Sequence, residues 1–84
     1  MSEVSWYVYL LECQDGSVYT GVTNDLDARM LKHQQGKGSK YVASKGFKKL
    51  LSSIPAKDKS EACKMEYQIK QLSRKEKLER FNLI

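Results

Sequence analysis

Side chains suited to cutting a phosphodiester gather around one expected strand-to-helix corner, YTGVTNDLDARMLKH. Tyr19 stands in the strand, while Arg29 and His33 are four residues apart and therefore share one face of the following helix. An arginine suits the planar, bidentate contacts of a phosphate, and a tyrosine or a histidine could orient or deprotonate water. Tyr9 before this stretch and Glu66 far after it complete the candidate set.

Glu66 differs from the other acidic residues in its helical neighbours. It falls among the apolar residues that the spacing assigns to a core stripe, Ala62, Met65, Ile69 and Leu72. A carboxylate on a buried helix face is costly unless it is paired or binds a metal. Glu66 could hold Mg²⁺ with waters and a substrate phosphate, or it could pair with Arg29 or a lysine, or lie at the margin of the stripe.

Two apolar stretches, residues 6–13 (WYVYLLEC) and 18–23 (VYTGVT), predict strands joined at the turn signal Asp15-Gly16. A two-residue loop would place Tyr9 opposite Val22 and turn Tyr19 to the other face. A three-residue loop with a left-handed Gly16 would place both tyrosines on one face, as a shared site requires.

Gly21 lies inside the second strand, where its missing side chain allows a close approach or marks a simple bulge. The helix after this strand is expected to be capped by Asn24 and to end at Gly36. Its predicted buried stripe consists of Leu26, Met30 and Leu31. His33 is either a group that acts on water or an exposed helix residue.

The segment GKGSKYVASKGFKK combines lysines with aromatic residues. It predicts a loop with one helical turn at residues 39–45, then a third strand at 47–54 that stops at Pro55. Either it is a solvated mobile loop or it binds nucleic acid through phosphate contacts and base stacking. The residues predicted for nucleic-acid binding are Lys37, Lys40, Tyr41 and Lys45.

Two further helices are predicted to start at capping boxes, Asp58 with Glu61 and Ser73 with Glu76. The second should turn Leu78, Phe81 and Leu83 inward. Together these elements predict a small α/β fold, a three-stranded, largely antiparallel sheet covered by about three helices.

Eighty-four residues with 40% hydrophobic content suit a single domain over 1–84. The net charge of +5 favours a polyanionic partner, either nucleic acid or an acidic membrane surface, and the charge alone does not choose between them. Cys13 and Cys63 lack metal-site spacing, so we expect reduced, partly buried thiols. The N-terminus MSEVSW resembles no signal peptide and no apolar run could span a bilayer, so we expect a cytoplasmic protein without a membrane partner.

The ordered set of YVY at 7–9, YTG at 19–21, Arg29, His33 and Glu66 resembles the GIY-YIG nuclease domain over nearly the whole chain. It particularly resembles the short, single-domain bacterial branch of that superfamily. The first motif has Tyr7 in place of glycine and the second has Thr20 in place of isoleucine. The asparagine that many relatives carry after the glutamate has only Asn82 as a candidate.

The resemblance implies a single-metal endonuclease that hydrolyses DNA with Mg²⁺ or Mn²⁺. It implies that Tyr19 acts at the attacking water and that Tyr9 supports the site. It further implies that Arg29 contacts the scissile phosphate and that Glu66 binds the metal. His33 matches a histidine that several branches of the family carry, and Gly21 matches the YIG glycine. By family analogy the enzyme is structure-directed, linked to DNA repair or recombination, and takes specificity from a protein partner. The alternative is a noncatalytic nucleic-acid-binding module with the same fold. An exposed Glu66 remote from Arg29 would favour the module, and no pattern indicates an oligomeric state.

Overall fold

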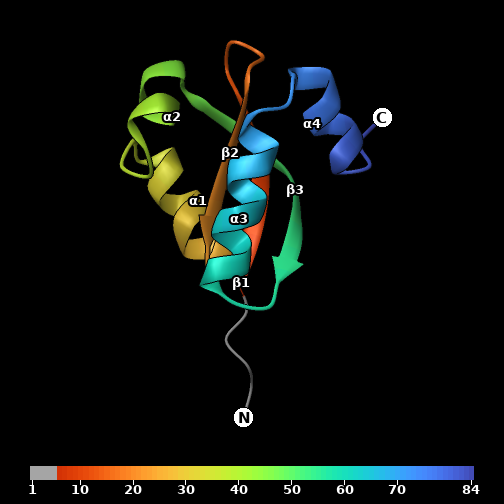
Figure 1. Cartoon of the computed structure of the whole chain (residues 1–84). Helices are drawn as coiled ribbons and strands as arrows, with labels where there is room; N and C mark the ends of the chain where they lie inside the picture. Colours follow the sequence, from red (N-terminus) through yellow and green to blue (C-terminus); the bar gives the residue numbers. More distant parts are fainter. Residues whose placement is uncertain (1–5) are drawn as a thin grey trace.

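A three-stranded sheet positions the candidate site (Figure 1). The computed structural model describes residues 6–84, which leaves the N-terminal segment MSEVS outside the described residues. The strands are β1 (Trp6–Cys13), β2 (Val18–Thr23) and β3 (Phe47–Ala56), antiparallel and in the order β2-β1-β3. Four helices accompany them, α1 (Leu26–Gln34), α2 (Lys40–Lys45), α3 (Lys59–Lys70) and α4 (Arg74–Arg80). The predicted α/β class is confirmed, and α2 is the helical turn expected at residues 39–45.

The hairpin between β1 and β2 adopts the register that a shared site requires. Tyr9 pairs with Gly21, and the Cys13 N–H donates to the Ser17 carbonyl at 2.8 Å, so the loop has three residues. Gly16 supplies the left-handed conformation, with a φ of 87°. Tyr9 and Tyr19 consequently lie on the same face of the sheet.

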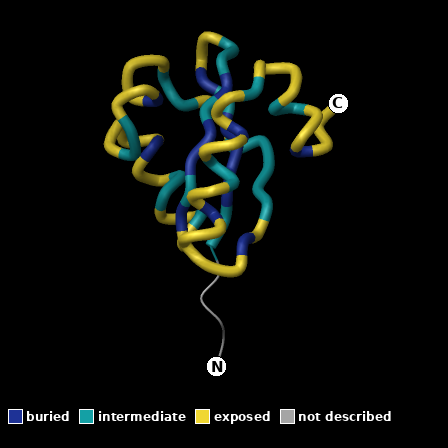
Figure 2. Tube along the Cα trace, in the orientation of Figure 1, coloured by how far each residue is buried: buried dark blue, intermediate teal, exposed yellow. Residues whose placement is uncertain are grey.

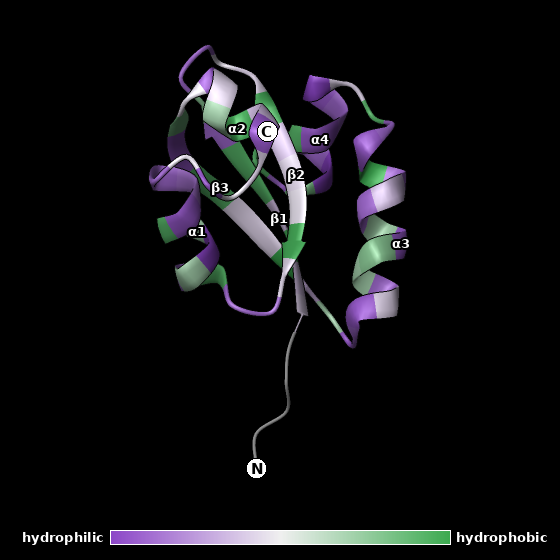
Figure 3. Cartoon of the chain, turned by 90° about the vertical axis from the view of Figure 1, so that its left-hand side faces the viewer, coloured by the Kyte–Doolittle hydropathy of each residue, from purple (hydrophilic) through white to green (hydrophobic). Residues whose placement is uncertain are grey.

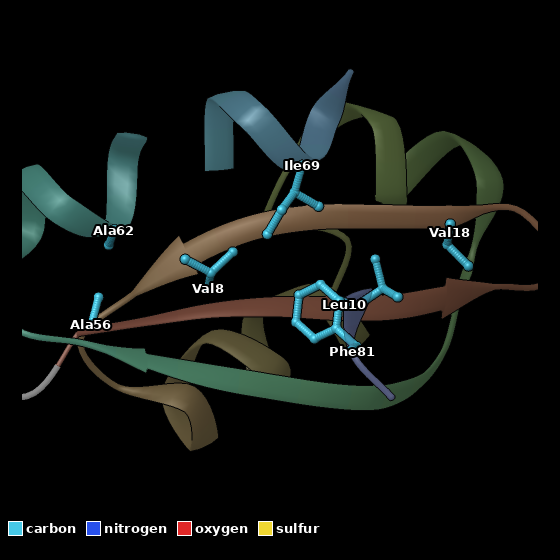
Figure 4. Close-up of a cluster of buried hydrophobic side chains, with 7 residues drawn as sticks. All are labelled: Val8, Leu10, Val18, Ala56, Ala62, Ile69 and Phe81. Carbon is cyan, nitrogen blue, oxygen red and sulfur yellow. The ribbon is translucent and has the colours of Figure 1, made fainter. Parts of the chain in front are cut away.

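The helices cover the two faces of the sheet in pairs, α1 and α2 on one side and α3 and α4 on the other (Figure 3). Because side chains alternate along a strand, β1 feeds two separate cores. The α3 side holds the apolar cluster shown in Figure 4, made of Val8, Leu10, Val18, Ala56, Ala62, Ile69 and Phe81. The α1 side holds Tyr9, Leu11, Cys13 and Val42. In Figure 2, the central strand β1 is accordingly buried along most of its length.

Two expectations for α1, its N-cap and its buried face, are wrong. The cap of α1 is Asp25, whose carboxylate accepts from the Ala28 N–H, and Asn24 lies outside it. Leu31 is 54% exposed because α1 turns Leu26, Met30 and His33 inward instead. These three residues are spaced i, i+4 and i+7, so Leu31 falls beside the buried face.

The ends of β3 and α4 also differ from expectation. The strand continues through Pro55 to Ala56, which an edge strand tolerates because the missing N–H faces away from its neighbour. Leu83 is 36% exposed, since the chain reverses at Asn82, whose φ is 59°.

Both predicted caps of the last two helices form, but only one is a complete box. Ser73 and Glu76 exchange side-chain and backbone hydrogen bonds as predicted. Asp58 accepts from the Glu61 N–H, whereas the Glu61 carboxylate accepts from the Lys57 N–H and not from that of Asp58. Over the described residues, no helix has the length and apolar character needed to cross a membrane.

Candidate active site

A buried hydrogen bond between Tyr9 and His33 forms the centre of the candidate site. Tyr9 Oη and His33 Nε2 are 2.8 Å apart, and both residues are almost fully excluded from solvent. His33 was open to being an exposed helix residue, but it is the buried residue of α1. The other ring nitrogen, Nδ1, is buried without a hydrogen-bond partner among the described residues.

The environment keeps both members of this pair neutral at physiological pH. Burial raises the pKa of Tyr9, the nearby Tyr19 and Glu66 add to this rise, and Arg29 opposes it. The net result is a pKa of about 12. Burial lowers the pKa of His33, and the positive charge of Arg29 lowers it further. Tyr9 is therefore a protonated phenol at neutral pH, suited to hydrogen bonding and not to acting as a base.

Two glycines make room for the paired rings. A Cβ on Gly21 would lie 2.5 Å from Tyr9 Cζ and 3.0 Å from Tyr19 Cε2, with the Tyr9 hydroxyl nearer still. A Cβ on Gly38 would lie 2.7 Å from His33 Cε1. Gly21 thus permits a close ring approach, not a bulge, and Gly38 lets the segment after α1 cover the imidazole.

Tyr19 lies at the outer side of this pair. Its ring centroid is 6.3 Å from that of Tyr9 and 5.8 Å from that of His33. On its other side it stacks with Tyr41 of α2, at 5.8 Å and an interplanar angle of 23°. Lys70 Nζ of α3 stands 5.7 Å from the same ring centroid. Tyr19 therefore connects the buried pair to the exposed edge of the sheet.

Arg29 and Glu66 bring opposite charges to the site. Arg29, half-buried on α1, acts electrostatically on Tyr9 and on His33. Glu66 acts on Tyr9 from α3, and its side chain is 22% exposed. The structure thus brings the five candidate side chains together and leaves Glu66 only partly exposed.

Glu66 forms an ion pair, as one of the structural alternatives for it anticipated. Its partner is Lys70, one helical turn later on α3, with Oε2 and Nζ 3.2 Å apart. The same ammonium reaches the Tyr19 ring. Lys70 was absent from the candidate set, although an acid followed four residues later by a lysine is a visible signal for this contact. Gly38 was also missed, since only the packing of a distant segment reveals its role.

The donor set around Glu66 suits one type of metal site. Among residues 6–84 no group of three or more His, Cys, Asp or Glu side chains could enclose an ion. A closed transition-metal site therefore does not fit. A single carboxylate fits Mg²⁺ or Mn²⁺ when the remaining ligands are waters and substrate oxygens, because Mg²⁺ retains several waters.

The residues predicted to bind nucleic acid occupy two settings. Tyr41 lies at the site through its stack with Tyr19. Lys45 forms an ion pair with Asp15 at 3.5 Å and stands 5.8 Å from the Tyr41 ring centroid. Lys37 and Lys40 are exposed, without an ion pair in the described part of the chain.

Asn82, the candidate for the family asparagine, does not join the site in the described structure. It is exposed beyond α4, and its backbone N–H donates to the Glu79 carbonyl at 3.0 Å. Its left-handed backbone serves to reverse the chain after the helix.

Comparisons with known proteins give one consistent result. The family model described as the GIY-YIG catalytic domain matches residues 5–80. UPF0213 protein BH0048 of Halalkalibacterium halodurans is 49% identical over 71 residues, covering 84% of this chain and 76% of the relative. The UPF0213 protein of Cronobacter sakazakii is 46% identical over 72 residues, covering 86% and 76%. The solution NMR structure of UPF0213 protein BH0048 from Bacillus halodurans has a TM-score of 0.58 and 46% identity, covering 94% of this chain and 84% of that one.

Proposed function

The chain belongs to the GIY-YIG catalytic domain family, and we propose that it is a metal-dependent endonuclease that hydrolyses DNA phosphodiester bonds. The observation that carries the proposal is the buried Tyr9–His33 hydrogen bond with Tyr19, Arg29 and Glu66 around it. By analogy with the family, the enzyme selects DNA by its structure and acts in repair or recombination. A protein partner supplies further specificity.

In the proposed hydrolysis, a water molecule attacks phosphorus and the bond to one ester oxygen breaks. Tyr19, as its phenolate, orients that water and takes up one of its protons, and the Lys70 ammonium beside the ring stabilises the negative charge of the phenolate before this transfer. The departing ester oxygen takes its proton from solvent water. The guanidinium of Arg29 binds the phosphate oxygens, whose charge grows in the transition state.

The buried pair acts on the position of Tyr19. Tyr9 keeps its proton at neutral pH and remains hydrogen-bonded to His33, so its ring is fixed against Gly21. Glu66 is the carboxylate proposed to hold Mg²⁺ or Mn²⁺. Such an ion, when bound, polarises the phosphate and lowers the pKa of coordinated water.

The test is cleavage of single-stranded, duplex, flapped and branched DNA with Mg²⁺ or Mn²⁺. Tyr19→Phe and Glu66→Gln should each reduce the rate by about 100-fold or more, as removal of a general base or of a metal ligand does. Tyr67→Phe and Glu79→Gln are matched controls, because both residues are exposed and lie outside the site. Equal rates for the site variants and their controls would reject the proposal.

The Glu66–Lys70 ion pair favours a second candidate, a noncatalytic nucleic-acid-binding module. In that case the Glu66 carboxylate pairs with Lys70 of the same helix and binds no metal. Salt-sensitive DNA binding without cleavage of any substrate in the panel would identify the module.

A further inference from the structure

A groove of about 370 Å³ follows the edge of β2 beside the candidate site. Figure 3 views the molecule with β2 between the two helical layers, so residues from both layers can reach this edge. Its lining comes from β2, α2, α3 and α4 and consists of Val18, Tyr19, Thr20, Tyr41, Lys70 and Lys77. Three of these residues, Tyr19, Tyr41 and Lys70, also lie at the candidate active site.

Two ammonium groups face this groove. Lys77 of α4 is half-buried, and within residues 6–84 it forms no ion pair. Burial lowers the pKa of Lys77, and the like charge of Lys70 lowers it further. The charge of Lys70 is paired with that of Glu66, whereas the charge of Lys77 has no acidic partner among the described residues. An anion in the groove would relieve the repulsion between them.

The rest of the groove offers a hydroxyl group and two aromatic rings, which suit the phosphate and the sugar or base of a nucleotide. Thr20, 1% exposed, has a hydroxyl without a hydrogen-bond partner in the described structure, which is costly in a buried position. The stacked rings of Tyr19 and Tyr41 add an aromatic wall. Sugars and bases pack against aromatic rings, whereas phosphates need cationic or hydrogen-bonding groups.

We propose that this groove binds a phosphate of the substrate strand adjacent to the phosphate that is cleaved, with Lys77 as its main ligand. The inference rests on the proposed function, because Tyr19 is taken to lie at the cleaved phosphate. The strand then crosses the edge of β2, from Arg29 and Tyr19 on the α1 side to Lys77 on the α4 side.

The test measures binding of a fluorescent single-stranded oligonucleotide to the full chain in EDTA, across a range of salt concentrations. Loss of one phosphate contact in Lys77→Gln should make the slope of log K against log salt shallower by about 0.7 and weaken binding about fivefold near 0.1 M salt. Lys77→Arg should retain the native slope. Lys75→Gln is the matched control, since Lys75 lies exposed on the same helix and outside the groove.

An unchanged slope in Lys77→Gln, or the same small loss in Lys75→Gln, overturns the proposal, as does a native protein that does not bind the oligonucleotide. Melting temperatures of the three variants separate lost binding from lost folding. Cleavage with Mg²⁺ is measured in parallel. If the native protein cleaves DNA and Lys77→Gln binds the oligonucleotide as tightly as the native protein, the phosphate site in the groove is rejected and the endonuclease proposal stands. If binding depends on Lys77 and no DNA is cleaved, the endonuclease proposal is rejected and the phosphate site stands.

Discussion

Replacing Gly21 by alanine should disrupt the site through a single methyl group. The new Cβ would lie 2.5 Å from Tyr9 Cζ and 3.0 Å from Tyr19 Cε2, well inside van der Waals contact. Tyr9 has little room to yield, since it is fully buried and hydrogen-bonded to His33. The ring must therefore move away from β2, and its hydrogen bond to the imidazole must lengthen or break.

The expected loss of stability is about 3 kcal/mol. Forcing one methyl group into a packed core costs about 1–3 kcal/mol. A broken Tyr9–His33 hydrogen bond adds about 1 kcal/mol, and it leaves both imidazole nitrogens of His33 unpaired. For a domain of this size, the sum lowers the melting temperature by roughly 12–24 °C.

Urea and thermal unfolding measure this loss, with Gly16→Ala as the control. Gly16 has a φ of 87° and nothing within 4 Å of an added Cβ, so its variant carries only backbone strain, about 1 kcal/mol. In a Tyr9→Phe background, Gly21→Ala should cost about 1 kcal/mol less, because the hydrogen bond is already lost. A Gly21→Ala protein as stable as Gly16→Ala would refute the steric reasoning.

Four further outcomes are expected. Burial lowers the pKa of His33 in the folded protein, so its contribution to stability is fully present above about pH 6.5 and is lost as the pH falls through the lower folded value. The loss is at most about 1.4 kcal/mol per pH unit. Between pH 7 and 5, the urea midpoint of His33→Gln should therefore vary less than that of the native protein. Thr20→Val should raise the free energy of unfolding by about 1 kcal/mol, since it removes a buried, unpaired hydroxyl, and a lower urea midpoint would contradict this. A thiol reagent should label exposed Cys63 at once and buried Cys13 only after unfolding; immediate labelling of both would disprove the burial difference. Tyr41→Ala should weaken binding of single-stranded DNA by about 1–3 kcal/mol in fluorescence anisotropy while Tyr41→Phe binds normally, and equal losses in both would exclude stacking.

The parts of the fold that depend on short-range patterns were predictable from the sequence. The bounds of β1 and β2 follow from apolar runs around a turn signal, and the start of α4 follows from its capping box. The hairpin register was open between two loops, because Asp15-Gly16 is compatible with both. The left-handed Gly16 distinguishes them, and a one-residue slip would have separated Tyr9 from Tyr19.

Features that depend on contacts between distant segments could not be predicted in the same way. From the sequence alone, a buried face of α1 that includes Leu31 is as compatible with helical spacing as the observed buried face, which includes His33. The segment around Gly38 decides between them, because it packs directly on the imidazole. The burial of His33, and with it the hydrogen bond to Tyr9, thus depends on residues that no local periodicity connects.

The strength of the Glu66–Lys70 ion pair bears on the choice between the enzyme and the noncatalytic module. Its two side chains are 22% and 48% exposed, and they are one helical turn apart. Pairs of this kind contribute about 0.3–0.5 kcal/mol, because water and salt screen them. A divalent ion or a phosphate can therefore displace Lys70 at little cost. The ion pair is consequently a weak objection to metal binding by Glu66, and the released ammonium would remain beside Tyr19 and the groove, where the proposed substrate brings negative charge.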